Sequence, residues 1–155
     1  EKKKTGYLAY IKAGLMSILE KIKSYKAEVE VDGVKLDDEY SLIMVSNSNH
    51  IAGIDGFHKD VCLDDGEMEV ILCKSKSKTE FISDFLSFFA GNKTKNIISI
   101  KARDIKIKLK EKLKKKWCID GEKFNYDGEE YHISVKDRMK FLTPVKVKTK
   151  KLFNN

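Results

Sequence analysis

Apolar residues recur at three- and four-residue spacing in two segments of the chain. The first set runs from Tyr7 to Ile22 and the second from Phe81 to Phe89, a spacing that places each set along one face of a helix. The pattern therefore predicts two amphipathic helices, the first fading by Tyr25 and the second spanning roughly 79–90. Each helix has one apolar face and must pack that face on another element.

Elsewhere apolar and polar residues alternate, which is the period of a strand with one buried face. The segment 105–109 alternates with lysines, so its outer face should be cationic, whereas the continuous apolar run 40–45 predicts a strand buried on both faces. Two helices among many short strands predict an α+β, mainly β fold: an antiparallel β-sandwich in a single domain of residues 1–155. Its core should include Leu42, Met44, Val70, Leu72, Ile107 and Trp117.

Asp-Gly pairs mark four expected turns. An Asp-Gly pair between apolar runs supplies the two residues with φ > 0 that a type I′ hairpin turn needs, and taken alone each pair is an ordinary turn. The last pair should join strands at 124–126 and 131–135 in a hairpin, and the segment 46–60 should be a long loop with a functional or specially packed role. The four pairs that mark these turns are Asp32-Gly33, Asp65-Gly66, Asp120-Gly121 and Asp127-Gly128, and a fifth Asp-Gly pair, Asp55-Gly56, lies within the long loop.

The composition bounds the class of protein. A hydrophobic content of 41% over 155 residues is enough to fill one core. The net charge of +7 is carried by lysine, since Arg103 and Arg138 are the only arginines. Because base reading usually relies on arginine forks, the excess fits phosphate or anionic lipid better than nucleic acid. A basic membrane-binding surface, or only a solvated face, could be formed by Lys106, Lys108, Lys110 and Lys114–Lys116.

Three cysteines, Cys62, Cys73 and Cys118, occur without a Cys-x-x-Cys spacing, which argues against a disulfide framework and a zinc site. Cys73 and Cys118 sit in apolar strand patterns and are expected to be buried and inert. No apolar run approaches the ~20 residues that span a bilayer, and no secretory segment is visible. We therefore expect a cytoplasmic protein.

Three motifs, in order along the chain, resemble those of a known family. They are the helix opening Gly6-Tyr7-Leu8-Ala9-Tyr10, the segment Leu63-Asp64-Asp65-Gly66 followed by Glu67-Met68-Glu69-Val70, and the segment Trp117-Cys118-Ile119-Asp120-Gly121-Glu122. In this order and at this separation they resemble the C-terminal β-sandwich domain of bacterial diacylglycerol kinases and YegS-like lipid kinases, whose catalytic domain is related to NAD kinase. The resemblance extends from about Gly6 to Pro144.

The chain departs from that family in one large respect. Family members carry a Gly-Gly-Asp-Gly-Thr nucleotide-binding signature in an N-terminal domain, and this sequence contains none. It therefore resembles the second half of a two-domain lipid kinase. The enzyme's own N-terminal nucleotide-binding domain would be a partner, to which the tail 144–155 could return. By itself this half is expected to be inactive.

The resemblance implies an ATP-dependent kinase that phosphorylates a lipid hydroxyl, such as that of diacylglycerol, at the inner face of the membrane, and that could form a homodimer. It assigns Glu122 as the general base and Asp120 as its neighbour in the magnesium and phosphate region. Two residues apart across a turn, both carboxylates can point into one cleft, where like charge could raise one pKa. The competing interpretation is an exposed turn with two ordinary carboxylates. The sequence does not identify which lipid is the acceptor.

The resemblance also places a structural Mg²⁺ at the earlier Asp-Gly segment. The Asp65 carboxylate would be a ligand, with the main-chain carbonyls of Cys62 and Glu67 as further candidates, a mixture of oxygens that suits Mg²⁺. Asp64 is the rival ligand, and a turn with no metal is the alternative. A second class of function also stays open: a stand-alone basic β-sandwich module that binds anionic membrane or nucleic acid without catalysis.

Overall fold

The fold is described from a computed structural model. The described residues are 22–48, 50–51, 54–55, 61–111, 117–124 and 129–136. The predicted first helix, apart from Ile22, lies outside them, as do Lys114–Lys116, the Asp127-Gly128 turn and the tail 144–155. Within the described part of the chain, no helix is long and apolar enough to cross a membrane.

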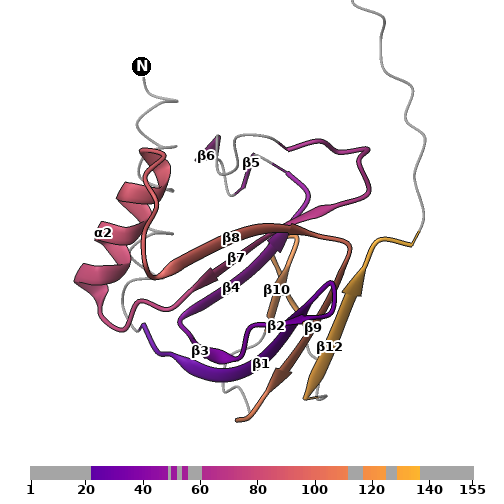
Figure 1. Cartoon of the computed structure of the whole chain (residues 1–155), viewed down its shortest axis with the longest axis horizontal. Coiled ribbons are helices and arrows are strands. Elements are labelled where there is room, and N and C mark those ends of the chain that lie inside the picture. The colour runs from indigo at the N-terminus through magenta and orange to yellow at the C-terminus, as the bar shows by residue number, and fades with distance from the viewer. Residues whose placement is uncertain are drawn as a thin grey trace, which may run out of the picture.

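Two antiparallel sheets dominate the described chain (Figure 1). The first has the strand order β12-β9-β1-β2, with β3 also paired to β1. It consists of β1 (Tyr25–Val31), β2 (Val34–Lys35), β3 (Asp38–Tyr40), β9 (Asp104–Leu109) and β12 (Glu130–Ser134). The second has the order β4-β7-β8 and consists of β4 (Leu42–Ser46), β7 (Met68–Cys73) and β8 (Ile97–Ala102). The other elements are the hairpins β5 (His50–Ile51) with β6 (Ile54–Asp55) and β10 (Trp117–Ile119) with β11 (Glu122–Phe124), and the helix α2 (Lys78–Phe89).

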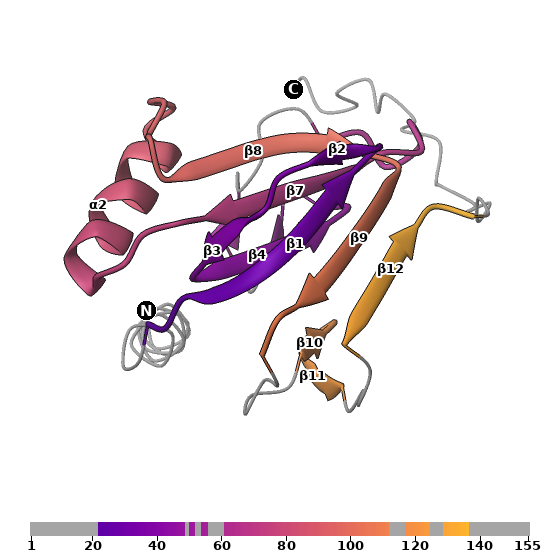
Figure 2. The same cartoon turned by 60° about the horizontal axis from the view of Figure 1, so that its bottom comes forward.

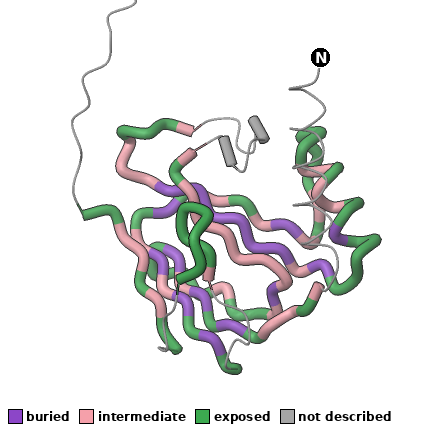
Figure 3. Tube along the Cα trace, turned by 180° about the vertical axis from the view of Figure 1, so that it is seen from behind, coloured by how far each residue is buried: buried purple, intermediate pink, exposed green. Residues whose placement is uncertain are grey.

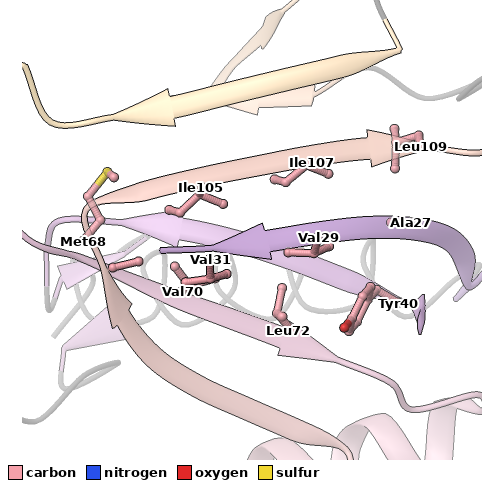
Figure 4. Packing of buried hydrophobic residues seen from close by; sticks show 11 residues of the cluster. Ala27, Val29, Val31, Tyr40, Met68, Val70, Leu72, Ile105, Ile107 and Leu109 are labelled. Atoms are coloured by element: carbon pink, nitrogen blue, oxygen red, sulfur yellow. The ribbon is translucent and has the colours of Figure 1, made fainter. Parts of the chain in front are cut away.

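The two sheets pack face to face, so the predicted β-sandwich is confirmed (Figure 2). Val29 of β1 and Ile107 of β9 meet Val70 and Leu72 of β7 in the space between the sheets (Figure 4). Each of these four side chains is at most 1% exposed, and burial of an aliphatic side chain of this size stabilises a fold by about 1.5–3 kcal/mol. Trp117 packs against the same cluster, as predicted.

The opposite face of β7 contributes to a second apolar cluster. Ile71 and Cys73 are buried there together with Phe81 of α2. Leu42 and Met44 of β4 pack on this second cluster rather than on the first. Because β7 contacts both clusters, all six of its residues are buried, whereas buried and exposed residues alternate along β1 and β9 (Figure 3). One strand therefore connects the sandwich to the helix.

Helix α2 has close to the predicted bounds, because its first turn is capped by side chains. The hydroxyl of Ser77 accepts the main-chain N–H of Glu80 at 3.2 Å, and the Glu80 carboxylate accepts the main-chain N–H of Ser77 at 3.3 Å. This reciprocal capping box satisfies two donors at the helix start. Farther along, the Asp84 carboxylate accepts the Ser75 hydroxyl at 2.6 Å and the Asn96 amide at 2.8 Å. These bonds tie the helix to the segments on either side of it.

The apolar run 40–45 is not one strand. The chain leaves the first sheet at Tyr40 and enters the second at Leu42, with Ser41 alone between β3 and β4. Ser41 donates its main-chain N–H to the Cys73 carbonyl at 2.8 Å, which holds the corner on β7. The prediction of a strand buried on both faces is wrong, because β4 lies at the edge of its sheet and its residues are only half-buried.

Arg103 forms a second corner, as the single residue between β8 of the second sheet and β9 of the first. The Asp32 carboxylate accepts the main-chain N–H of Arg103 at 3.0 Å and that of Asp104 at 2.8 Å. In return the Asp32 N–H donates to the Asp104 carbonyl at 2.9 Å. Asp32 and Gly33 have φ angles of 48° and 83°, as a type I′ turn requires. This Asp-Gly turn therefore also fastens the β1–β2 hairpin to the junction between the sheets.

The outer face of the first sheet is mixed in charge rather than cationic. The register of β1 and β9 sets Glu30 opposite Lys106, and the Lys106 ammonium lies 2.8 Å from the Glu30 carboxylate. Lys110 lies 3.2 Å from Glu28 in the same way. Hydrogen bonding to Glu30 raises the pKa of Lys106, and hydrogen bonding to Lys110 lowers the pKa of Glu28. The predicted cationic face is wrong for these lysines, because the glutamates of β1 lie beside them.

Strand β12 pairs with β9, where Tyr131 lies opposite Ile107. Phe124 of β11 pairs with Trp117 of β10. The predicted hairpin of 124–126 with 131–135 is therefore wrong for Phe124, since a period of two identifies a strand but not its partner, and residues 125–126 lie outside the described part of the chain. The predicted loop 46–60 also holds a short hairpin, in which His50 of β5 lies opposite Asp55 of β6.

Tyr40 is buried at the first corner. Its side chain is 2% exposed, and its hydroxyl donates to the main-chain carbonyl of Leu36. Burial, assisted by the charges of Asp38 and Asp37, raises the pKa of Tyr40 to about 12. An unfolded tyrosine titrates near pH ~10, so the folded state keeps a proton that the unfolded chain releases. The stability that this group contributes is complete below about pH 10 and is lost between about pH 10 and 12.

We expect Tyr40→Phe to lower the free energy of unfolding by about 1 kcal/mol at pH 8, because a buried hydrogen bond is lost. Between about pH 10 and 12 the variant should lose less additional stability than the wild type, since it has no phenol to ionise at this position. Urea unfolding across that range is the measurement. Equal alkaline losses in the two proteins would contradict a phenol held protonated by burial.

Candidate functional site

Strands β10 and β11 are joined by a two-residue turn at Asp120-Gly121. Ile119 lies opposite Glu122 across the turn, and φ is 50° at Asp120 and 87° at Gly121. Both angles lie in the left-handed region, which aspartate tolerates and glycine adopts freely. The predicted hairpin at this Asp-Gly pair is confirmed, and its geometry fixes where each neighbouring side chain points.

Glu122 lies on the apolar face of this hairpin. Residues directly opposite each other in a strand pair project to the same side, and successive residues along a strand project to opposite sides. Since Trp117 pairs with Phe124 and Ile119 pairs with Glu122, these four side chains share one face. The carboxylate therefore stands among three large apolar residues.

Trp117 anchors the hairpin on the sandwich. Its ring lies 4.7 Å from that of Tyr131, centroid to centroid, and packs against the first core cluster. Its indole nitrogen is buried, without a hydrogen-bond acceptor in the described ranges. Ile119 and Phe124, by contrast, are 51% and 45% exposed. Trp117 thus anchors the hairpin on the sandwich, and two partly exposed apolar side chains lie beside Glu122.

Asp120 and Glu122 line one open hollow together with Ile119, Lys123 and Phe124. Both carboxylates are exposed. A carboxylate in such a place can accept a proton, and apolar neighbours can hold an aliphatic group next to it. The structure therefore brings together the two residues that the sequence singled out, and it adds apolar residues whose exposure the sequence pattern did not predict.

Cys118 is exposed, so the prediction of a buried thiol is wrong at this position. It lies opposite Lys123, on the face of the hairpin away from Trp117. A two-stranded hairpin that packs through one face leaves the other in solvent, whatever the hydrophobicity of its residues. Cys73 is buried as predicted, and Cys62 is exposed.

The segment before β7 holds Asp65 in place by two contacts. Its carboxylate accepts the main-chain N–H of Glu67 at 2.9 Å, and the Lys101 ammonium lies 3.1 Å from its other oxygen. These two hydrogen bonds, the main-chain one foremost, lower the pKa of Asp65. The rival residue Asp64 instead accepts the thiol of Cys62 at 2.9 Å, which raises the pKa of that thiol.

Glu69 is a residue that the sequence analysis did not single out. It lies opposite Lys101 in the register of β7 and β8, and it is 4% exposed. The Lys101 ammonium is 3.9 Å from one oxygen, and neither oxygen has a hydrogen-bond partner among the described residues. Burial raises the pKa of Glu69. The signal that could have identified it is one charge inside the apolar strand Met68–Cys73, where a buried charge is costly.

The donors around Asp65 fit a magnesium ion. In the part of the chain that is described, no three His, Cys, Asp or Glu side chains gather as a metal cluster. The expected site, however, needs only one carboxylate with main-chain carbonyls and water. The unpartnered oxygens of Glu69 supply a further hard donor close by. Cys62 and Glu67 stay candidates for the main-chain carbonyls.

The two candidate sites lie in different parts of the sandwich. Figure 2 shows the β10–β11 hairpin at one end and the segment that leads into β7 at another. A cation at Asp65 would therefore act mainly on the stability of the second sheet, and any proton transfer at Glu122 is a separate event.

Comparison with known proteins places this geometry in a family. Residues 2–135 match the family model described as the YegS C-terminal NAD kinase beta sandwich-like domain. The diacylglycerol kinase of Bacillus subtilis (strain 168) is 29% identical over 126 residues, which cover 80% of this chain and 38% of the relative. The chain thus spans about two fifths of that relative's length.

Solved structures agree with the family match. One structure of a candidate diacylglycerol kinase from Bacillus anthracis str. Sterne has a TM-score of 0.55 at 25% identity, and covers 66% of this chain and 36% of the other. A second such structure has a TM-score of 0.51 at 26% identity, and covers 77% and 39%. The chain belongs to the YegS C-terminal NAD kinase β-sandwich-like domain family.

Proposed function

We propose that the protein containing this chain is an ATP-dependent lipid kinase, and that this domain supplies the general base and the lipid side of the cleft. The relative at 29% identity is named a diacylglycerol kinase, which supports a lipid with a free hydroxyl, such as diacylglycerol, as acceptor. The observation that carries the proposal is the placement of Glu122 between the exposed apolar side chains of Ile119 and Phe124.

This arrangement suits an acceptor that has a hydroxyl next to an aliphatic tail. Ile119 and Phe124 would hold the apolar part of the lipid, because they remain open to solvent in this domain. Glu122 would then accept the hydroxyl proton as the lipid oxygen attacks the γ-phosphorus and the bond to the departing ADP oxygen breaks. General base catalysis of this kind typically contributes about 10²–10⁴-fold. ATP with magnesium supplies the phosphoryl group when bound in the N-terminal domain.

Asp120 would act from the turn as the second carboxylate of the cleft. Its φ of 50° is one that the turn requires, so Asp120 contributes to the hairpin's turn geometry as well as to the lining of the hollow. Asparagine adopts this φ angle as readily as aspartate does and has a side chain of the same shape, but it carries no charge. Asparagine therefore separates a chemical role for Asp120 from a structural one.

The cation proposed at Asp65 would have a structural role. Asp65 would provide the carboxylate ligand, and Cys62 and Glu67 would provide main-chain carbonyls. A divalent cation here would replace part of the charge that Lys101 now supplies at 3.1 Å. Its expected effect is on the stability of the folded state, through binding that the unfolded chain lacks.

An anionic membrane is the second proposed partner, with the net charge of +7 as its support, whereas Lys108 lies opposite Glu28 and Glu130 in its sheet. Lys106 and Lys110 contribute less than the sequence suggested, because each is paired with a glutamate. We expect weak binding to anionic vesicles at low salt that disappears near physiological salt, where the Debye length is about 8 Å. Vesicle co-sedimentation of the full-length protein is the measurement. Binding that is insensitive to salt, or absent at low salt, would exclude this electrostatic contribution.

The test of catalysis is Glu122→Gln in the full-length protein. Glutamine keeps the size and hydrogen-bonding shape of the side chain but cannot take the proton. Turnover of diacylglycerol in vesicles should fall by about 10²–10⁴-fold with little change in nucleotide affinity. Asp120→Asn should also lower turnover and change its dependence on magnesium concentration.

Asp127→Asn is the matched control, since Asp127-Gly128 is another Asp-Gly pair with no assigned role. It should leave turnover close to that of the wild type, because Asp127 has no assigned role in binding or proton transfer. If Glu122→Gln behaves like Asp127→Asn, the general base assignment is wrong and the β10–β11 hairpin serves structure alone.

A further inference from the structure

Three charged side chains meet at the end of the β7–β8 pair. The Lys101 ammonium lies 3.1 Å from the Asp65 carboxylate and 3.9 Å from that of Glu69. The side chain of Lys101 is 37% exposed, that of Asp65 25% and that of Glu69 5%. One cation thus lies between two carboxylates, one partly open to solvent and one closed off from it.

The Glu69 carboxylate is buried without a hydrogen bond to its counter-charge. Neither of its oxygens has a hydrogen-bond partner among the described residues, and 3.9 Å from the ammonium is too far for a hydrogen bond. A buried carboxylate that is left in this state is destabilising, and buried charges are normally paired or bound to a metal. Lys101 directs its hydrogen bond to Asp65 instead.

The local charge count also favours an added cation. Asp65 and Glu69 carry two negative charges against the single positive charge of Lys101. The neighbouring pair, one residue outside each of these strands, is balanced, with the Arg103 guanidinium 3.3 Å from the Glu67 carboxylate. The three-residue cluster therefore retains an excess negative charge, while its neighbour does not.

We propose that Asp65 and Glu69 form a two-carboxylate site for a divalent cation, and that Lys101 is the counter-ion which the cation displaces. The inference rests on the proposed magnesium site at Asp65 and adds two roles to it: Glu69 is a ligand, and Lys101 competes with the metal. Two carboxylates with main-chain carbonyls and water form the hard oxygen set that Mg²⁺ and Ca²⁺ prefer. The displaced ammonium is near the surface and can turn to solvent.

The experiment is an isothermal titration calorimetry measurement of MgCl₂ binding to the full-length protein, without nucleotide and at constant ionic strength, and thermal unfolding gives the metal-free Tm of each variant. The midpoint of the binding isotherm reports the affinity of the folded state for the ion. The variants are Glu69→Gln, Lys101→Met and Asp65→Asn. Arg103→Met is the matched control, because it removes the positive charge of the neighbouring balanced pair.

Lys101→Met should move the midpoint to about tenfold lower magnesium concentration, since it removes the competing charge. Glu69→Gln should move the midpoint about 10–100-fold higher, as loss of a metal-binding group does. In the absence of metal Glu69→Gln should melt at or above the wild-type Tm, because glutamine carries no buried charge, and this shows that the variant folds. Arg103→Met should move the midpoint less than Lys101→Met does, because Arg103 directs its hydrogen bond to Glu67 and acts on Asp65 only through its charge.

The alternatives give different results. If Glu69→Gln keeps the wild-type midpoint while Asp65→Asn abolishes the response, Glu69 is not a ligand. The proposed magnesium site at Asp65 would still stand. A wild-type midpoint in Lys101→Met overturns the competition. No magnesium response in either the wild type or Lys101→Met overturns both the inference and the magnesium site. The catalytic role proposed for Glu122 is independent of all three outcomes.

Discussion

The passage of the chain between its two sheets at single residues is the constraint on which the rest of this structure depends. Ser41 separates β3 from β4, and Arg103 separates β8 from β9. Because a single residue joins the two strands at each corner, a strand of one sheet must lie close to a strand of the other. Asp32 fixes the second corner by accepting two main-chain N–H groups there. The face-to-face packing of Val29 and Ile107 on Val70 and Leu72 follows from these junctions.

The positions of both candidate sites derive from this frame. The β10–β11 hairpin is held through Trp117, which packs on the same core and on Tyr131. The turn geometry then leaves Glu122 exposed on an apolar face. The Asp65 cluster, by contrast, is built on β7 and β8 close to the Arg103 corner. A change of charge there would act on the junction between the sheets rather than on the hairpin.

Sequence periodicity predicted the elements whose signal is local. The capped helix α2 and the alternating strand β9 match their predicted positions closely. The pattern failed where partners distant in the chain decide the outcome. The run 40–45 reads as one buried strand, yet it crosses between sheets at Ser41. Lys106 of β9 and Lys110 just after it belong to a pattern that predicts a cationic face, yet glutamates of β1 form ion pairs with both.

Some features of the candidate site could likewise be predicted from the sequence, and others depend on the folded structure. Asp120 and Glu122 were singled out from motif resemblance, and both line one hollow in the structure. The exposure of Ile119, Phe124 and Cys118 could not be predicted, because it depends on which face of the hairpin packs on the core. The lone charge of Glu69 within β7 is visible in the sequence, but its lack of hydrogen-bond partners is a property of the folded strands alone.

The central claim, that the β10–β11 hairpin faces the cleft where ATP and lipid meet, can be tested with thiols on its two faces. Ile119→Cys places a thiol on the face of Glu122, whereas the native Cys118 lies on the opposite face. Alkylation of both thiols in the full-length Ile119→Cys variant, followed by peptide mass spectrometry, should be measured with and without a non-hydrolysable ATP analogue and diacylglycerol, at fixed magnesium. The account predicts that the ligands slow the alkylation at position 119 severalfold and leave that of Cys118 nearly unchanged. An unchanged rate at position 119 would contradict the placement of this face of the hairpin in the cleft.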